Sequence, residues 1–120
     1  MCRSVLVVDD NRSFRDAARQ LLERGGFVVV AEAENGYEGI QQAAAHKPDI
    51  AIVDVQLPDI DGFEVAEQIS GLDVSVRVIL TSSLDGADFG ALVVDSPAAG
   101  FVPKAELSSS AIEALLVPSP

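Results

Sequence analysis

The sequence is poor in cysteine, aromatic residues and basic residues. Its 120 residues include one cysteine, one tyrosine, five phenylalanines and no tryptophan. The single cysteine, Cys2, cannot form an internal disulfide, so nothing implies an oxidising compartment. Eight basic residues stand against nineteen acidic ones, which gives a net charge of -11. Because phosphate backbones and anionic surfaces are bound by clusters of Lys and Arg, nucleic acids and membranes are poor direct partners.

Long apolar runs are also missing. No segment approaches the ~18 consecutive apolar residues of a membrane-spanning helix. The only apolar run before the first pair of aspartates has four residues, 5–8, so the start of the chain predicts neither export nor membrane insertion. The composition, 48% hydrophobic and 22% charged, is that of a folded chain. We therefore expect one cytoplasmic domain over residues 1–120.

Short apolar runs alternate with segments of helical periodicity. The runs lack polar alternation, which is typical of strands buried on both faces of a parallel sheet. This alternation predicts a doubly wound α/β fold with right-handed crossovers. The predicted strands are residues 5–8, 27–30, 50–53, 76–81 and 101–102, and apolar residues at helical spacing fall within 14–22, 37–44, 63–69 and 107–116.

The stretch 84–100 is the weakest helix candidate. It contains Gly86, Gly90 and Pro97, each of which is costly inside a helix. We expect a fourth helix here that is short or mobile. The final letters VPSP are turn-like and fit either a true terminus or the start of a linker, with a slight preference for a chain cut from a longer protein.

Aspartates end two of the predicted strands. Asp9 and Asp10 follow the first strand, and Asp54 follows the third. In open α/β sheets, ligands bind outside the carboxyl ends of the strands, so neighbouring strands would bring these side chains together. Three adjacent anions repel one another, and all-oxygen ligation is preferred by Mg²⁺. The pattern predicts a magnesium site, although a single aspartate at a strand end is more often a helix cap. Asp10 and Asn11 are both possible caps of the helix that follows the first strand.

The ordered segments VLVVDD, DIAIVDVQLPDIDGFE, VRVILTSS and GFVPK resemble the receiver domain of bacterial response regulators over essentially the whole chain. The resemblance implies a flavodoxin-like (βα)5 fold, whose five-stranded parallel sheet has the order 2-1-3-4-5. It implies that Asp54 accepts a phosphoryl group and that Lys104 pairs with it. It also implies a Mg²⁺ ion bound by Asp9, Asp10, Asp54 and the backbone carbonyl of Gln56, and a turn matched by Pro58 and Gly62.

The resemblance further implies a switch made of a hydroxyl and an aromatic residue. The hydroxyl is assigned to Ser82, because the intervals 104 − 82 = 22 and 101 − 82 = 19 fit the family spacing, with Thr81 as the alternative. Phe101 resembles the switch aromatic, although plain core packing would also place it there. The chain departs from the family at Ala105, where a proline is common after the lysine.

The function implied is that of a signalling switch and not of an enzyme. A sensor histidine kinase would phosphorylate Asp54, and the chain would catalyse only this transfer and its own slow dephosphorylation. A carboxylate is already ionised at neutral pH, so no general base is required. The output would be a downstream protein or the chain's own output domain. A homodimer through the fourth helix, fifth strand and fifth helix is a further expectation.

Three other functions fit the fold class less well. A Mg²⁺-dependent aspartyl-phosphate phosphohydrolase needs a second aspartate two residues after the nucleophile, where this chain has Gln56. A flavin or nucleotide binder needs a phosphate-cradling loop after the first strand, where DDNRS offers acids. A pseudo-receiver that binds partners without phosphorylation would not need the full set of site residues. His46 lies far along the chain from the aspartates and is interpreted as a surface residue.

Overall fold

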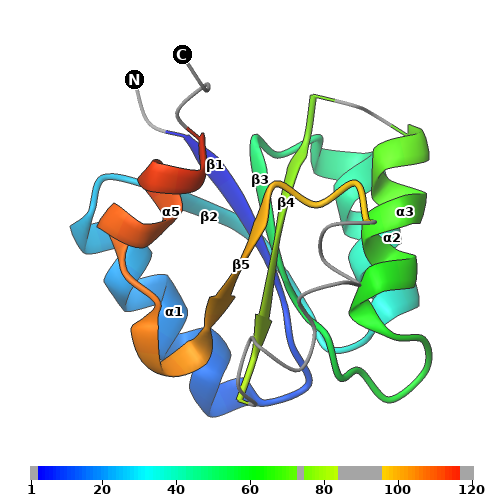
Figure 1. The fold of residues 1–120 in the computed structure, drawn as a ribbon, viewed down its shortest axis with the longest axis horizontal. Helices are drawn as coiled ribbons and strands as arrows, with labels where there is room; N and C mark the ends of the chain where they lie inside the picture. The colour runs from blue at the N-terminus through cyan, green and yellow to red at the C-terminus, as the bar shows by residue number, and fades with distance from the viewer. Residues whose placement is uncertain (1–2, 73–74, 84–95, 117–120) are drawn as a thin grey trace.

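The computed structural model describes residues 3–72, 75–83 and 96–116 of the chain. They build one parallel sheet of five strands in the order β2-β1-β3-β4-β5, which confirms the predicted flavodoxin-like topology (Figure 1). The strands are β1 (Ser4–Val8), β2 (Val28–Ala33), β3 (Ile50–Asp54), β4 (Arg77–Ser82) and β5 (Gly100–Pro103). The helices are α1 (Arg12–Arg24), α2 (Gly36–His46), α3 (Gly62–Leu72) and α5 (Ser109–Leu116), and a short 3₁₀ turn, η2, spans Lys104–Glu106.

Helices cover both faces of the sheet, with α1 and α5 on one side and α2 and α3 on the other (Figure 1). The alternation of side chains along each strand divides the core into two clusters. Leu6, Val53 and Leu80 pack with α2 and α3, whereas Val7 and Ile52 pack with α1 and α5. The central strands are therefore buried on both faces, as their unbroken apolar sequences predict.

Strand β2 differs from the prediction in its bounds and in its burial. It runs from Val28 to Ala33 and not over residues 27–30. As an edge strand it alternates, with Val29 buried while Val28 and Val30 are 44% and 38% exposed. The apolar run was wrongly interpreted as buried on both faces. Its last residues pair with β1, Glu32 with Val7 and Ala33 with Val8. Arginines of α1 form ion pairs with the Glu32 carboxylate.

Smaller differences concern the last third of the chain. Strand β4 begins and ends one residue later than predicted, and β5 is longer by one residue at each end. Leu107 precedes α5 instead of belonging to it, because η2 takes up the chain between β5 and the helix. Residues 84–95 of the expected fourth helix and the final VPSP lie outside the described residues, and residues 96–99 contain no helix.

The cap of α1 decides a point that the sequence left open. The side chain of Asn11 accepts a hydrogen bond from the Phe14 N–H at 3.2 Å, so Asn11 is the N-cap. Asp9 and Asp10 are thereby left for other contacts. Among the described residues, no helix is both long and apolar enough to span a membrane.

Candidate functional site

Three carboxylates meet at the carboxyl edge of the sheet. Asp9 follows β1, Asp10 lies in the turn to α1, and Asp54 ends β3, which is paired with β1. Each contributes an oxygen atom, and these oxygens lie within 4.8 Å of one another. Asp9 is fully buried and Asp54 is 5% exposed, whereas Asp10 is exposed. The predicted convergence of the aspartates is thus present in the structure.

Lys104 bridges the two buried carboxylates. Its Nζ atom lies 2.7 Å from Oδ2 of Asp9 and 3.2 Å from Oδ2 of Asp54. The same atom lies 4.5 Å from the centre of the Phe14 ring, within the range of a cation–π contact. The lysine begins η2 directly after β5, and Ala105 follows it inside this turn. The ammonium group is therefore held between strand ends and the first turn of α1.

Burial and like charge shift the pKa values of this cluster. Burial raises the pKa of Asp54, and the charge of Asp9 adds to this, against lowering by the Gln56 N–H and Lys104. Burial alone would lower the pKa of Lys104. Its hydrogen bond to Asp9 and the charges of Asp54 and Asp9 outweigh that effect, so its pKa is raised. The lysine therefore stays protonated, whereas ionised Asp54 is electrostatically disfavoured.

Backbone contacts orient the carboxylates. The Asn11 N–H donates to Oδ1 of Asp9 at 2.8 Å, and the Gln56 N–H donates to Oδ1 of Asp54 at 3.0 Å. Gly62 allows the start of α3 to approach this turn, because a Cβ atom there would lie 2.4 Å from the carbonyl oxygen of Asp54. The Gly62 N–H donates to the Val55 carbonyl at 2.8 Å. This gives a physical reason for the glycine after the acceptor.

The two candidate hydroxyls occupy opposite faces of β4. Thr81 pairs in register with Asp54, and its Oγ1 atom is buried with no hydrogen-bond partner among the described residues. Ser82 is also buried and shares the face of Leu80, which packs in the same cluster as Phe101. Ser82 and Phe101 therefore share a sheet face, and Thr81 shares the other with Ile79.

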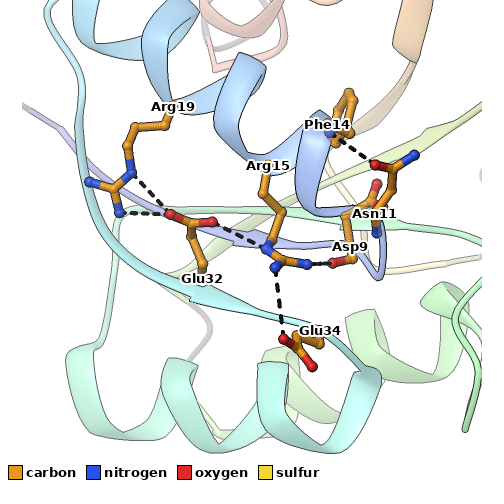
Figure 2. A network of polar contacts seen from close by, with 7 residues as sticks. All are labelled: Asp9, Asn11, Phe14, Arg15, Arg19, Glu32 and Glu34. Atoms are coloured by element: carbon orange, nitrogen blue, oxygen red, sulfur yellow. Dashed lines mark hydrogen bonds and ion pairs between the residues drawn. The ribbon is translucent and has the colours of Figure 1, made fainter.

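Two residues that support the site were not predicted from the sequence. Arg15 of α1 is buried and donates from Nη1 to the carbonyl oxygen of Asp9 at 2.6 Å (Figure 2). Asp59, in the turn after Asp54, accepts from the N–H groups of Gly36 and Tyr37 at the start of α2, at 2.8 and 2.9 Å. A signal for Arg15 existed, because it stands three and seven residues before Ala18 and Leu22 on the buried stripe of α1.

The donor set fits a hard divalent cation. Three carboxylates face one ammonium group, which leaves the described cluster with an excess of two negative charges when all groups are ionised. Carboxylate oxygens from both buried and exposed positions suit Mg²⁺, which keeps part of its water shell. An exposed Asp10 beside two buried partners leaves the site open to solvent on one side.

The fold and this site define a flavodoxin-like domain with an acidic cluster at the carboxyl edge of its sheet, and comparison gives the family. A model of the response regulator receiver domain matches residues 5–116. The chain belongs to this family. It is therefore a signalling domain of the kind found in two-component systems.

Three known proteins illustrate the relationship. A protein of Pseudomonas aeruginosa named as a transcriptional regulator is 41% identical over 102 residues, which are 85% of this chain and 49% of that protein. The chemotaxis protein CheY of Bacillus subtilis is 30% identical over 115 residues, or 96% of each chain. A response regulator structure from Burkholderia pseudomallei, with a phosphorylated aspartic acid, a calcium ion and citrate, superposes with a TM-score of 0.83 at 25% identity, covering 96% of this chain and 66% of that one. The chain thus spans about half the length of the first of these relatives.

Proposed function

We propose that this chain is a phosphorylation-dependent switch in which Asp54 accepts a phosphoryl group from a sensor histidine kinase. The observation that carries the proposal is the placement of Asp54 at the carboxyl edge of the sheet, beside one ammonium group and two further carboxylates. Membership of the receiver family supports the same role. The proposed location is the cytoplasm.

The transfer needs a nucleophile and groups that neutralise charge. A carboxylate oxygen of Asp54 forms a bond to phosphorus while the P–N bond of the phosphohistidine donor breaks, and the electron pair goes to the donor nitrogen. Lys104 is already within 3.2 Å of Asp54 and can stabilise charge on the phosphoryl oxygens. No residue has to remove a proton from the nucleophile.

Mg²⁺ is part of the proposal because the residues present fit it. Asp9, Asp10, Asp54 and the backbone carbonyl of Gln56 would hold the ion. When bound, it supplies positive charge that offsets the carboxylates and the phosphoryl oxygens. The chain's own contribution is to fix the orientation of Asp9 and Asp54 through the N–H groups of Asn11 and Gln56.

The proposed switch uses Ser82 and Phe101. Phosphorylation at Asp54 would favour a state in which the Ser82 hydroxyl binds a phosphoryl oxygen, and Phe101, on the same face of the sheet, packs further inward. The matched variants Ser82→Ala and Thr81→Val separate the two hydroxyls. The readout is the change in the backbone amide NMR signals of β5 on phosphorylation, which reports the movement of Phe101. We expect Ser82→Ala, and not Thr81→Val, to abolish this change. If only Thr81→Val abolished it, the switch hydroxyl would be Thr81.

The output of the switch depends on the protein or domain that the chain contacts. Because the P. aeruginosa relative is about twice as long and is named as a transcriptional regulator, we propose that a chain of this type acts on an attached output domain. The full-length match to CheY supports the alternative of a stand-alone domain that contacts a separate protein. In either case a histidine kinase is the upstream partner, and a homodimer could form through the face that includes β5 and α5.

The decisive experiment is phosphorylation by a small-molecule phosphodonor, followed by intact mass. Wild type should gain one phosphoryl group only when Mg²⁺ is present, and Asp54→Asn should gain none. Asp49→Asn is the matched control, because Asp49 directly precedes the opposite end of β3 and the substitution removes the same charge. A wild type that gains nothing would contradict the proposal and indicate a phosphorylation-independent pseudo-receiver.

A further inference from the structure

Arg15 is the one buried arginine among the described residues, and the proposed phosphotransfer does not use it. Its side chain is 9% exposed and enters the region between α1, the end of β1 and β2 (Figure 2). Nη1 donates to the Asp9 carbonyl at 2.6 Å, and Nε donates to Oε1 of Glu32 at 3.1 Å. Nη2 lies 3.9 Å from Glu34. One planar group thus joins three elements of the fold.

The contact to Asp9 is the informative one. Asp9 is fully buried, and each of its three oxygens has a partner from a different segment. The Asn11 N–H binds Oδ1, Lys104 lies against Oδ2, and Arg15 holds the main-chain carbonyl. That carbonyl belongs to the peptide joining Asp9 to Asp10. Its orientation fixes where the chain turns and where the Asp10 carboxylate is presented.

We propose that Arg15 is a positioning residue for the metal site, which sets the affinity of the Asp9–Asp10 turn for Mg²⁺ without touching the ion. The inference rests on the proposed function, because it concerns the same cation. Removing a group that hydrogen-bonds to a metal ligand without contacting the metal typically weakens metal binding by about 10–100-fold. The guanidinium group suits the task because its donors lie in a rigid planar fork that holds the carbonyl and Glu32 in a fixed geometry, whereas a lysine offers a compact charge on a flexible stem.

Arg19 provides a matched control. It stands one helical turn further along α1 and binds the same carboxylate, with Nη2 2.8 Å and Nε 3.0 Å from Oε2 of Glu32 (Figure 2). No hydrogen bond joins it to Asp9 within the described part of the chain. Arg15→Met and Arg19→Met therefore each remove one positive charge and one arginine partner of Glu32. Only Arg15→Met also releases the Asp9 carbonyl.

The sign of the effect separates positioning from electrostatics. Loss of a positive charge near an acidic site should strengthen cation binding by Coulomb's law, and most for the nearer arginine. A positioning role predicts the reverse for Arg15. The measurement is titration of unphosphorylated protein with MgCl₂ in a calorimeter, together with the Mg²⁺-induced rise in the melting temperature.

We expect Arg15→Met to raise the Kd for Mg²⁺ by about tenfold, and Arg19→Met to change it by less than about twofold. Arg15→Lys, which keeps the charge but loses the fork, should fall between them and provides the same reading if Arg15→Met does not fold. In phosphorylation assays the concentration of Mg²⁺ at half-maximal rate should rise in Arg15→Met, while the rate at saturating Mg²⁺ returns to near that of wild type.

Equal effects of the two methionine variants, or an unchanged or tighter Kd in both Arg15 variants, would overturn the role of Arg15. A lower rate at saturating Mg²⁺ with an unchanged half-maximal concentration would overturn it as well. A wild type that binds no Mg²⁺ would instead contradict the metal site of the proposed function. The two failures are therefore distinguishable in one set of titrations.

Discussion

Strand β3 carries an aspartate at each end, and the two have different surroundings. Asp49, just before the strand, is exposed, and its Oδ2 atom accepts from the N–H and hydroxyl of Ser4 at 2.9 and 3.3 Å. In return the Asp49 N–H donates to the Ser4 hydroxyl at 2.9 Å. Asp54, at the other end, is buried and shares one lysine with Asp9. Both aspartates lie beside β1. Their surroundings differ because β1 places Ser4 next to Asp49 and is followed by Asp9 next to Asp54.

The two carboxylates differ in how completely the fold balances their charge. At the amino end, β1 provides Ser4, whose N–H and hydroxyl donate hydrogen bonds to the Asp49 carboxylate. At the carboxyl end, β1 offers two more carboxylates. Ionised Asp54 is therefore costly for the folded state, and a bound cation would lower that cost.

The largest expected effect comes from removing the cation that distinguishes the carboxyl end. Lys104→Met should lower the rate of phosphorylation at saturating Mg²⁺ by roughly 100-fold, a typical loss for one group that stabilises transition-state charge. The rate is read by intact mass against time with a small-molecule phosphodonor. Lys47→Met, at the exposed C-cap of α2, is the control and should leave the rate unchanged. Equal rates in the two variants would contradict a role for Lys104 in the transfer.

The second prediction sets the two aspartates against each other in stability. Without Mg²⁺, Asp54→Asn should raise the melting temperature by roughly 3–6 °C, because it removes a buried charge from a repelling cluster. Asp49→Asn should lower it by about 3 °C, because it weakens the hydrogen bonds with Ser4. Both variants change the net charge by one, so an overall charge effect would move both in the same direction. Thermal unfolding followed by circular dichroism measures both shifts.

The third prediction concerns pH. Because the pKa of Asp54 is raised in the folded state, protonation of this group favours folding. Its contribution to the free energy of unfolding is therefore greatest at low pH and declines as the pH rises from the unfolded value of 3.8 through the raised folded value. Denaturant titrations without Mg²⁺ should show the advantage of Asp54→Asn over wild type growing across this window. A constant difference between the two proteins would show that burial of Asp54 carries no electrostatic cost.

The smallest expected effect lies on the ring that contacts the lysine. Phe14→Leu keeps the apolar volume but removes the cation–π contact with Lys104, 4.5 Å from the ring centre. The rate of phosphorylation should fall by about threefold, which corresponds to the lower range of such contacts. Leu21→Met, on the same helix but away from the lysine, is the control. If Phe14→Leu and the control had equal rates, the ring would not contribute to positioning Lys104, and the carboxylates of Asp9 and Asp54 alone would hold it.

Much of this arrangement could be predicted from the sequence. The buried runs of β1 and β3 and the aspartates that end them are local signals, and parallel pairing brings them together. The choice between Asp10 and Asn11 as the cap of α1 was not predictable, because either residue can cap a helix. Strand β2 was misjudged because an apolar run does not reveal whether its strand lies at an edge.

Arg15 was missed for a different reason. An arginine within a helix is usually a surface residue, and its burial depends on Glu32, which lies 17 positions away on β2. Asp59 likewise binds the start of α2, 22 and 23 residues earlier in the chain. The helical spacing of α1 signals the burial of Arg15, but the partners of Arg15 and Asp59 depend on how the elements pack, so the pattern of a single segment cannot predict these contacts.

The bridge from Lys104 to Asp9 and Asp54 also has a consequence for folding. The lysine is separated by 50 residues from Asp54 and lies still further along the chain from Asp9. The site therefore closes only after β5 has docked on β4, and such non-local pairing forms slowly. A chain that stops before β5 would display the aspartates without the ammonium group. Under the proposed function, an unfinished chain would therefore lack the group that stabilises charge on the phosphoryl oxygens, and it would be a slow phosphoacceptor until β5 had docked.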